Sequence, residues 1–129
     1  MILDSRLEFS NKQSVAATAA STNVVDLSSD RDIGPGRTMW VVLAVTTAIS
    51  AASASVALET DNAEGFGTKE VLATVTLPTA VGSRLVIGIP YTNKRYLRLN
   101  YTIGTGVSGN VSAWLTDQEP ASWQAYPDA

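Results

Sequence analysis

Acidic side chains are the first candidates for chemistry in this sequence. Asp26, Asp30 and Asp32 lie close together and could supply oxygen ligands to calcium or magnesium. Their spacing does not match an EF-hand loop, which needs ligands at fixed odd positions with a glycine and a glutamate at set places. We therefore expect no metal site here and assign these carboxylates to solvated turns and caps.

A second acidic group could in principle support glycoside hydrolysis by a pair of carboxylates. It comprises Glu59, Asp61, Glu64 and Glu70. Nothing in the spacing selects a pair, and the sequence holds no histidine and no cysteine. The commonest general base, the commonest zinc ligand and the thiolate nucleophile are therefore absent. We expect a protein that is not an enzyme and has no cofactor; a small hydrolase using Glu59 or Asp61 is the least favoured alternative.

Basic and aromatic residues alternate in the C-terminal half. The basic members are Arg84, Lys94, Arg95 and Arg98, and the aromatic members are Tyr91, Tyr96 and Tyr101. Three interpretations remain open: a nucleic-acid surface, a polar sheet face with local ion pairs, or anchors of a protein interface. The net charge of −3 argues against a surface that neutralises phosphates, so we expect no direct nucleic-acid binding.

The elements that must position these residues are strands. No window sustains the period of an amphipathic helix, whereas short apolar runs bounded by turn-forming residues recur. We predict strands over residues 14–18, 23–27, 38–47, 53–60, 70–77, 84–89, 95–103 and 110–116. Their spacing is typical of an antiparallel sandwich or barrel, and 129 residues suit a single domain.

Two of these strands differ in pattern. Residues 95–101 alternate, with Leu97, Leu99 and Tyr101 on one face, so the other face is expected to be wet or to make contacts. Residues 39–45 are apolar on both faces, which predicts a second cover by a neighbouring segment or subunit. The uncharged stretch 38–58 is long enough to span a bilayer, but its serines, threonines and β-branched residues favour two strands over a membrane helix.

The loops and termini complete the prediction. Residues 104–110 are rich in glycine and are expected to form a hairpin loop. Residues 1–13 are expected to form an extended arm, and the charges among residues 1–9 argue against a secretory signal. Residues 118–129 are expected to be an irregular tail in which Trp123 and Tyr126 dock on the domain or on a partner.

Six blocks stand out in order along the chain: residues 1–4, 16–27, 32–36, 56–61, 95–101 and 111–118. Together they resemble the small capsid cement (decoration) proteins of tailed bacteriophages, as in a short-tailed Bordetella phage. The resemblance spans residues 1 to about 118, and the tail does not match. It implies an all-β, antiparallel jelly-roll sandwich on the outer surface of the virion capsid, which clamps neighbouring major capsid protein subunits as a dimer or other small oligomer.

This resemblance and the residue patterns together nominate a set of interface residues. They are Ile2, Leu3, Arg6 and Phe9 in the arm, Tyr96 and Arg98 on the alternating strand, and Trp123 and Tyr126 in the tail. The alternative is a jelly-roll carbohydrate-binding module, in which exposed Trp114, Trp123 or Tyr91 would stack on sugar rings. Glycan binding would favour that alternative, and binding to expanded capsids would favour cement.

Overall fold

A computed structural model describes residues 7–29, 33, 39–50, 54–90, 93–103 and 108–117, and within them the regular structure is nine β-strands. The strands are β1 (Glu8–Ser14), β2 (Ala19–Ala20), β3 (Val25–Asp26), β4 (Trp40–Thr47), β5 (Ala54–Asp61), β6 (Glu70–Thr76), β7 (Arg84–Gly88), β8 (Tyr96–Ile103) and β9 (Asn110–Thr116). No helix of the described residues is long and apolar enough to cross a membrane.

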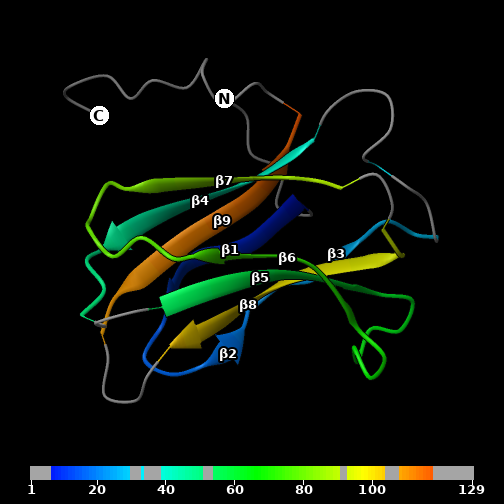
Figure 1. Cartoon of the computed structure of the whole chain (residues 1–129), viewed down its shortest axis with the longest axis horizontal. Coiled ribbons are helices and arrows are strands. Elements are labelled where there is room, and N and C mark those ends of the chain that lie inside the picture. Colours follow the sequence, from blue (N-terminus) through cyan, green and yellow to red (C-terminus); the bar gives the residue numbers. More distant parts are fainter. Residues whose placement is uncertain are drawn as a thin grey trace.

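The strands form two antiparallel sheets that pack face to face (Figure 1). One sheet has the order β1-β9-β4-β7. The other has the order β2-β8-β5-β6, with β3 also paired to β8. The predicted antiparallel β-sandwich is therefore confirmed, and its strand order is compatible with the jelly roll that the resemblance implies.

The core lies between the sheets and follows the alternation of the strands. Leu97, Leu99 and Tyr101 of β8 point inward and are buried, as their spacing predicts. In β4, Val41 and Leu43 also face the core, while Val42 is fully buried although the strand's alternation places it on the outer face. Trp40 and Ala44 on the same outer face are half-buried, so this face is covered in part, and its cover by a neighbouring segment or subunit stays a prediction.

Two local predictions need correction. The predicted strand 14–18 is not formed: Ser14 is the last residue of β1, and residues 15–18 connect β1 to β2. The connection from β8 to β9 is not a hairpin loop, because β8 and β9 belong to different sheets. The hairpin is instead the β5–β6 connection, whose strands pair directly. A glycine-rich run marks a bend in the chain, but it does not reveal which sheet the next strand joins.

The predicted arm of residues 1–13 is also too long, because β1 begins at Glu8 and pairs with β9. Its Phe9 side chain has 0% exposure and lies in the core cluster. Phe9 is therefore not an interface residue but a core residue, which corrects the prediction. Burial of a phenylalanine ring removes a large apolar area from water, so once β1 pairs with β9 the ring is more stable in the core than on the surface.

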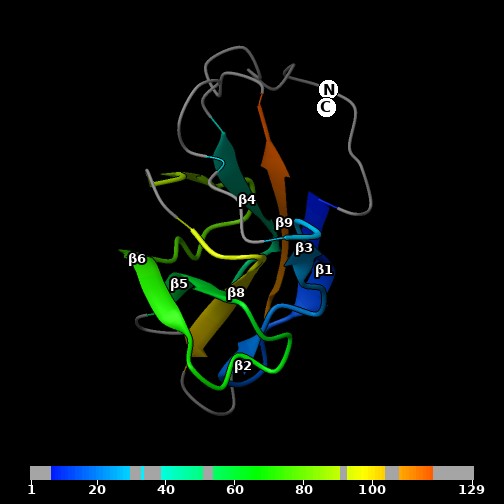
Figure 2. The same ribbon diagram turned by 90° about the vertical axis from the view of Figure 1, so that its right-hand side faces the viewer.

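The two long sides of the sandwich differ. We call the side formed by β1, β2 and β3 the closed side, and the side formed by β6 and β7 the open side. Figure 2 shows β6 opposite β1, β2 and β3. On the closed side several hydrogen bonds join the two sheets, among them Asn23 N to the Phe9 carbonyl (2.9 Å), the Gln13 side-chain amide to the Ala20 carbonyl (3.0 Å) and Thr22 N to Gln13 Oε1 (2.8 Å).

Candidate functional site

Charged and aromatic side chains gather at one end of the outer face of the five-stranded sheet. We call this region the charged end; it comprises Asp26, Glu59, Asp61, Phe66, Lys69, Glu70, Lys94, Arg95, Tyr96 and Arg98. Two strands supply its centre, because β5 and β8 pair with Glu59 opposite Arg98 and Asp61 opposite Tyr96. Side chains directly opposite on one face of an antiparallel pair are close enough to interact.

Glu59 is one of two buried carboxylates of this region; its exposure, like that of Asp61, is 2%. Arg98 donates from Nε to Glu59 Oε1 at 2.8 Å, and Lys69 Nζ lies 3.0 Å from Oε2. The Arg98 guanidinium also stacks on the Phe66 ring at 4.3 Å from its centroid. Both carboxylate oxygens are engaged by cations. Glu59 of β5 is thereby joined to β8 through Arg98 and to the β5–β6 connection through Lys69.

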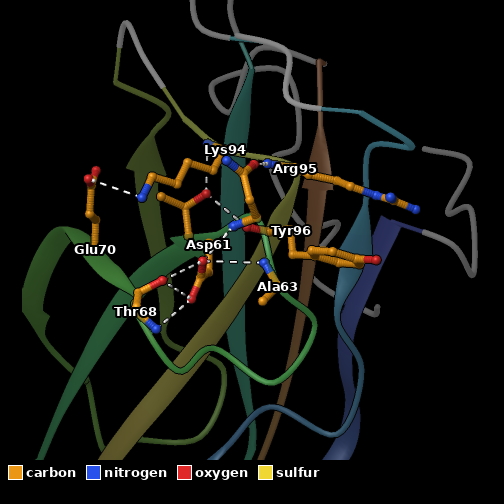
Figure 3. A network of polar contacts seen from close by, with 9 residues as sticks. Asp61, Ala63, Thr68, Glu70, Lys94, Arg95 and Tyr96 are labelled. Carbon is orange, nitrogen blue, oxygen red and sulfur yellow. Dashed lines mark hydrogen bonds and ion pairs between the residues drawn. The ribbon is translucent and has the colours of Figure 1, made fainter.

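Asp61 organises the β5–β6 connection (Figure 3). Its carboxylate accepts hydrogen bonds from the backbone N–H groups of Asn62 (2.6 Å), Ala63 (3.3 Å) and Thr68 (2.9 Å), and from the Thr68 hydroxyl. Burial alone would raise the pKa of Asp61, but these donors outweigh it and hold the pKa below the ordinary 3.8. The charged form is thus the one that the loop stabilises.

The same network positions the chain before β8 (Figure 3). Thr60 Oγ1 donates to the Tyr96 carbonyl and accepts from Lys94 N, both at 2.8 Å. Arg95 N donates to Asn62 Oδ1 at 3.1 Å, and Lys94 Nζ lies 3.3 Å from Glu70 Oε1. These contacts fix the backbone from which Arg95 and Tyr96 project.

Arg95 reaches across β8 toward the closed side. It donates to both carboxylate oxygens of Asp26, at 2.8 and 3.1 Å, and its guanidinium lies 4.8 Å from the centroid of the Tyr96 ring. The hydrogen bonds from Arg95, and then that from Ser28 N, lower the pKa of Asp26. Because these side chains are half-exposed or exposed, they are available to a partner while held in one geometry.

The predicted site residues fall into three groups. Tyr96 and Arg98 share the outer face of β8, as predicted, but Arg98 is largely used by Glu59 and Phe66 inside the fold. Phe9 is in the core, as noted above. Ile2, Leu3, Arg6, Trp123 and Tyr126 lie outside the described residues.

The structure also separates residues that the sequence places together. Arg84 lies on β7 in the other sheet, so the basic residues of the C-terminal half do not make one patch. The sequence placed Arg95 in the basic and aromatic group that could anchor an interface but did not nominate it as an interface residue, and the structural use of Asp61 and Phe66 was not predicted. The alternation of residues 95–101 was a signal for Tyr96 and Arg98 alone.

The candidate catalytic and metal sites take ordinary structural roles in the described residues. Glu59 and Asp61 lie on one face, but each has both oxygens engaged by neighbouring donors or cations. Over the described ranges no group of three or more histidine, cysteine, aspartate or glutamate residues could hold a metal ion. Asp30 and Asp32 lie outside those ranges. The arrangement is suited to rigid presentation of a surface.

Comparison with known proteins places this fold in a family. The family model described as Bbp16 matches residues 9–115, which run from β1 into β9. The chain belongs to the Bbp16 family. The family is named for a Bordetella phage protein, so this sandwich is related to a bacteriophage protein. No curated protein matches the chain.

Proposed function

We propose that this member of the Bbp16 family is a structural cement (decoration) protein of a bacteriophage head. It binds the outside of the icosahedral capsid and clamps neighbouring major capsid protein subunits. The observation that carries the proposal is the family match over residues 9–115, which covers nearly the whole described sandwich. The resemblance of the sequence blocks to cement proteins supports the same assignment.

The physical basis of such a function is linkage. A protein that binds only the assembled, expanded shell lowers the free energy of that state by RT ln(1 + [L]/Kd) at each site. When the protein contacts two subunits at once, the second contact forms at a high effective concentration, so two weak contacts can give strong binding to the shell. A rigid sandwich suits this task because little conformational entropy is lost when an ordered surface binds.

The exposed part of the charged end supports this proposal. Arg95 and Tyr96 are side-chain types enriched at protein interfaces and hot spots, and their geometry is fixed by Asp26 and by the backbone network around Thr60. We propose this surface as one contact to the shell. Ile2, Leu3, Arg6, Trp123 and Tyr126 stay candidates for further contacts.

The experiment that tests the function is co-sedimentation of the purified full chain with expanded empty heads. We expect saturable binding and a higher temperature of head disruption when the protein is added. Unexpanded heads are the matched control, and they should bind less. Equal absence of binding to both head forms, together with absence of the chain from purified virions, would contradict the proposal.

A short deletion tests the N-terminal candidates. Removing residues 1–9 would take Phe9 from the core and part of β1 from its sheet, so a loss of binding could reflect unfolding. Removing residues 1–6 leaves β1 intact and tests Ile2, Leu3 and Arg6 alone. An unchanged head affinity after that deletion would exclude these three residues as contacts.

The carbohydrate-binding alternative loses one of its three aromatic candidates. Trp114 is buried on β9, so its ring is not available to stack on a sugar. Tyr91 and Trp123 lie outside the described residues. The structure supplies no observation that favours this alternative over the cement function.

A further inference from the structure

The two outer faces of the sandwich differ in chemistry. On the five-stranded sheet the outward positions of β5 and β8 are mostly polar and include Glu59, Asp61 and Arg98. On the four-stranded sheet the outward positions of β9, β4 and β7 carry a group of apolar residues. We call this group the outer patch; it comprises Trp40, Val42 and Ala44 of β4, Trp114 of β9 and Val86 of β7.

The outer patch is contiguous and separate from the core. Val42 lies opposite Trp114 on one neighbouring strand and opposite Val86 on the other. Trp40 and Ala44 share its face, because side chains two residues apart in a strand point the same way. None of the five belongs to the core cluster, which takes the alternate residues of β4. From strand spacing and rise, the patch spans roughly 10 Å by 13 Å between backbone positions.

The outward side chains are most deeply buried on the β9 side of this face. Val42 has 0% exposure and Trp114 has 8%, and Thr116, which is also outward on β9, has 8%. Trp40 is half-buried, and Val86 at the β7 margin is 40% exposed. An antiparallel sheet ordinarily leaves its outer face polar and solvated. An apolar outer face that is buried toward β9 therefore indicates a cover that approaches from that strand.

The segment that follows β9 has the position and the chemistry of such a cover. β9 ends at Thr116, opposite Trp40, so the chain leaves the sheet at the border of the outer patch. Residues 118–129 lie outside the described residues. Their sequence carries no charge from residue 120 to residue 127 and includes Trp123 and Tyr126. Pro120 favours a turn, which a segment returning over the face requires.

The size of the outer patch also favours a short aromatic segment over a second folded copy. An aromatic side chain buries about 150–250 Å², so two rings can cover a patch of these dimensions. A stable interface between folded proteins takes about 800 Å² from each partner. Glu8 lies opposite Trp114 and Arg84 lies opposite Ala44, so charged residues border the patch. The chain between Thr116 and Trp123 can span about 25 Å, which reaches every part of it.

We propose that residues 118–129 fold back on their own domain and that Trp123 and Tyr126 pack on the outer patch. In the free protein the segment then acts as an intramolecular cover of the four-stranded sheet. The closure is inexpensive in entropy, because the segment is joined directly to the strand beside the patch. This docking does not depend on the proposed function, and it leaves the polar face of the five-stranded sheet exposed.

The test is a proximity measurement on the full chain, which has no cysteine of its own. Ala44→Cys places one thiol in the outer patch, and Ala121→Cys or Ala125→Cys places the second in the segment. Thr102→Cys, exposed on the outer face of the other sheet, replaces Ala44→Cys in the matched control. Under mild oxidation of dilute protein, the patch pair should form an intramolecular disulfide about tenfold or more faster, because docking raises the effective concentration. Circular dichroism verifies that the variants fold.

A second measurement tests the two rings. When Trp123→Ala and Tyr126→Ala are combined with the patch pair, its cross-linking rate should fall to that of the control pair. Trp123→Phe keeps a ring and should keep the rapid cross-linking. The fluorescence of anilinonaphthalene sulfonate, a dye that binds apolar surface, should rise in the variant without rings because the patch is uncovered.

The outcomes decide the occupant of the outer patch. Equal cross-linking rates for the patch and control pairs would overturn the proposal. Disulfides between two chains, detected by mass after mixing isotope-labelled and unlabelled copies, would overturn it in favour of a second copy. Rapid cross-linking that persists without the two rings would also overturn it. Each of these results leaves the cement function standing, because binding to heads is measured separately.

Discussion

The closed and open sides of this sandwich contain the edge strands of the same two sheets, but the contacts at the two sides differ. On the closed side, β1 meets the segment carrying β2 and β3, and backbone and glutamine hydrogen bonds join the sheets across the edge. On the open side, β6 and β7 end the sheets with half-buried apolar residues at the margin of the core.

We infer from this difference that the closed side contributes mainly to the stability of the fold and the open side mainly to binding. A fully buried apolar side chain has all of its surface removed from water on folding. A half-buried side chain still exposes apolar surface, which a binding partner can bury. We therefore expect substitutions on the closed side to affect folding, and substitutions on the open side to affect binding. The following predictions test that division, beginning with the largest effect.

The largest effect is expected from Phe9→Ala on the closed side. The Phe9 ring is fully buried, and its loss should lower the free energy of unfolding by about 3–5 kcal/mol, measured by urea denaturation. Val86→Ala on the open side is the control, and its effect should stay within about 0.5 kcal/mol. Similar losses in the two variants would remove the distinction between the sides.

A second comparison concerns two arginines that reach opposite sides: Arg95, just before β8, pairs with Asp26 of β3, and Arg98 of β8 pairs with Glu59 of β5. Arg98→Met should lower the free energy of unfolding by about 2 kcal/mol, because buried Glu59 loses one of its two cations. This is less than the full cost of breaking a buried pair, since Lys69 remains. Arg95→Met removes the exposed pair with Asp26 and should leave the urea midpoint nearly unchanged. A larger effect at Arg95 would show that the exposed pair supports the closed side.

A third prediction concerns a hydrogen bond that ties β1 to the other sheet through the core. The Tyr101 hydroxyl lies 2.8 Å from Ser10 Oγ, and Ser10 in turn donates to Gln13 at 2.6 Å, so Tyr101 is the donor. Tyr101→Phe should cost about 1 kcal/mol of unfolding free energy. Chemical denaturation measures this loss, and Tyr96→Phe on the outer face is the control, with a smaller expected effect.

Burial also raises the pKa of Tyr101 to about 12, so this side chain has a signature in alkali. The folded state holds the proton more tightly than the unfolded state. The stability that follows is present below pH 10 and is lost as the pH rises from 10 toward 12. Ultraviolet absorbance should show one tyrosine titrating late, and that late step should disappear in Tyr101→Phe.

The smallest effect on stability is expected at Asp61, the last residue of β5, which precedes β6 of the open side. Its lowered pKa means that its contribution to stability is present above pH 3.8 and is lost as the pH falls below that value. Asp61→Asn should lower the urea midpoint at neutral pH, and the difference from wild type should shrink in acid. Glu64→Gln, in the same connection, is the control. A difference that grew in acid would contradict the assigned direction of the pKa.

Local patterns predicted much of the strand content. The expected strands 53–60, 70–77, 84–89 and 110–116 each overlap a strand almost completely, because alternation and turn residues act over short distances. The strand at residues 8–14 was missed, since its polar sequence carries little apolar alternation. β1 is stabilised by pairing with β9, which lies at the other end of the chain.

The candidate site was predictable only in part. Tyr96 and Arg98 followed from alternation within one strand. Their partners did not follow, because Glu59 and Phe66 approach Arg98 through pairing between strands and through the β5–β6 connection. The assignment of Phe9 failed for the same reason: hydrophobicity alone does not distinguish a core ring from an interface ring.

The sequence by itself determined that this protein is all-β, that its core follows the alternation of β8, and that histidine and cysteine chemistry are absent. These properties depend on composition and on neighbours one or two residues apart. Only the tertiary structure decided which strands became edges, which carboxylates were buried and which strands lie together on each side of the sandwich. Those outcomes depend on pairing between residues far apart in the chain, and the local sequence does not encode that pairing.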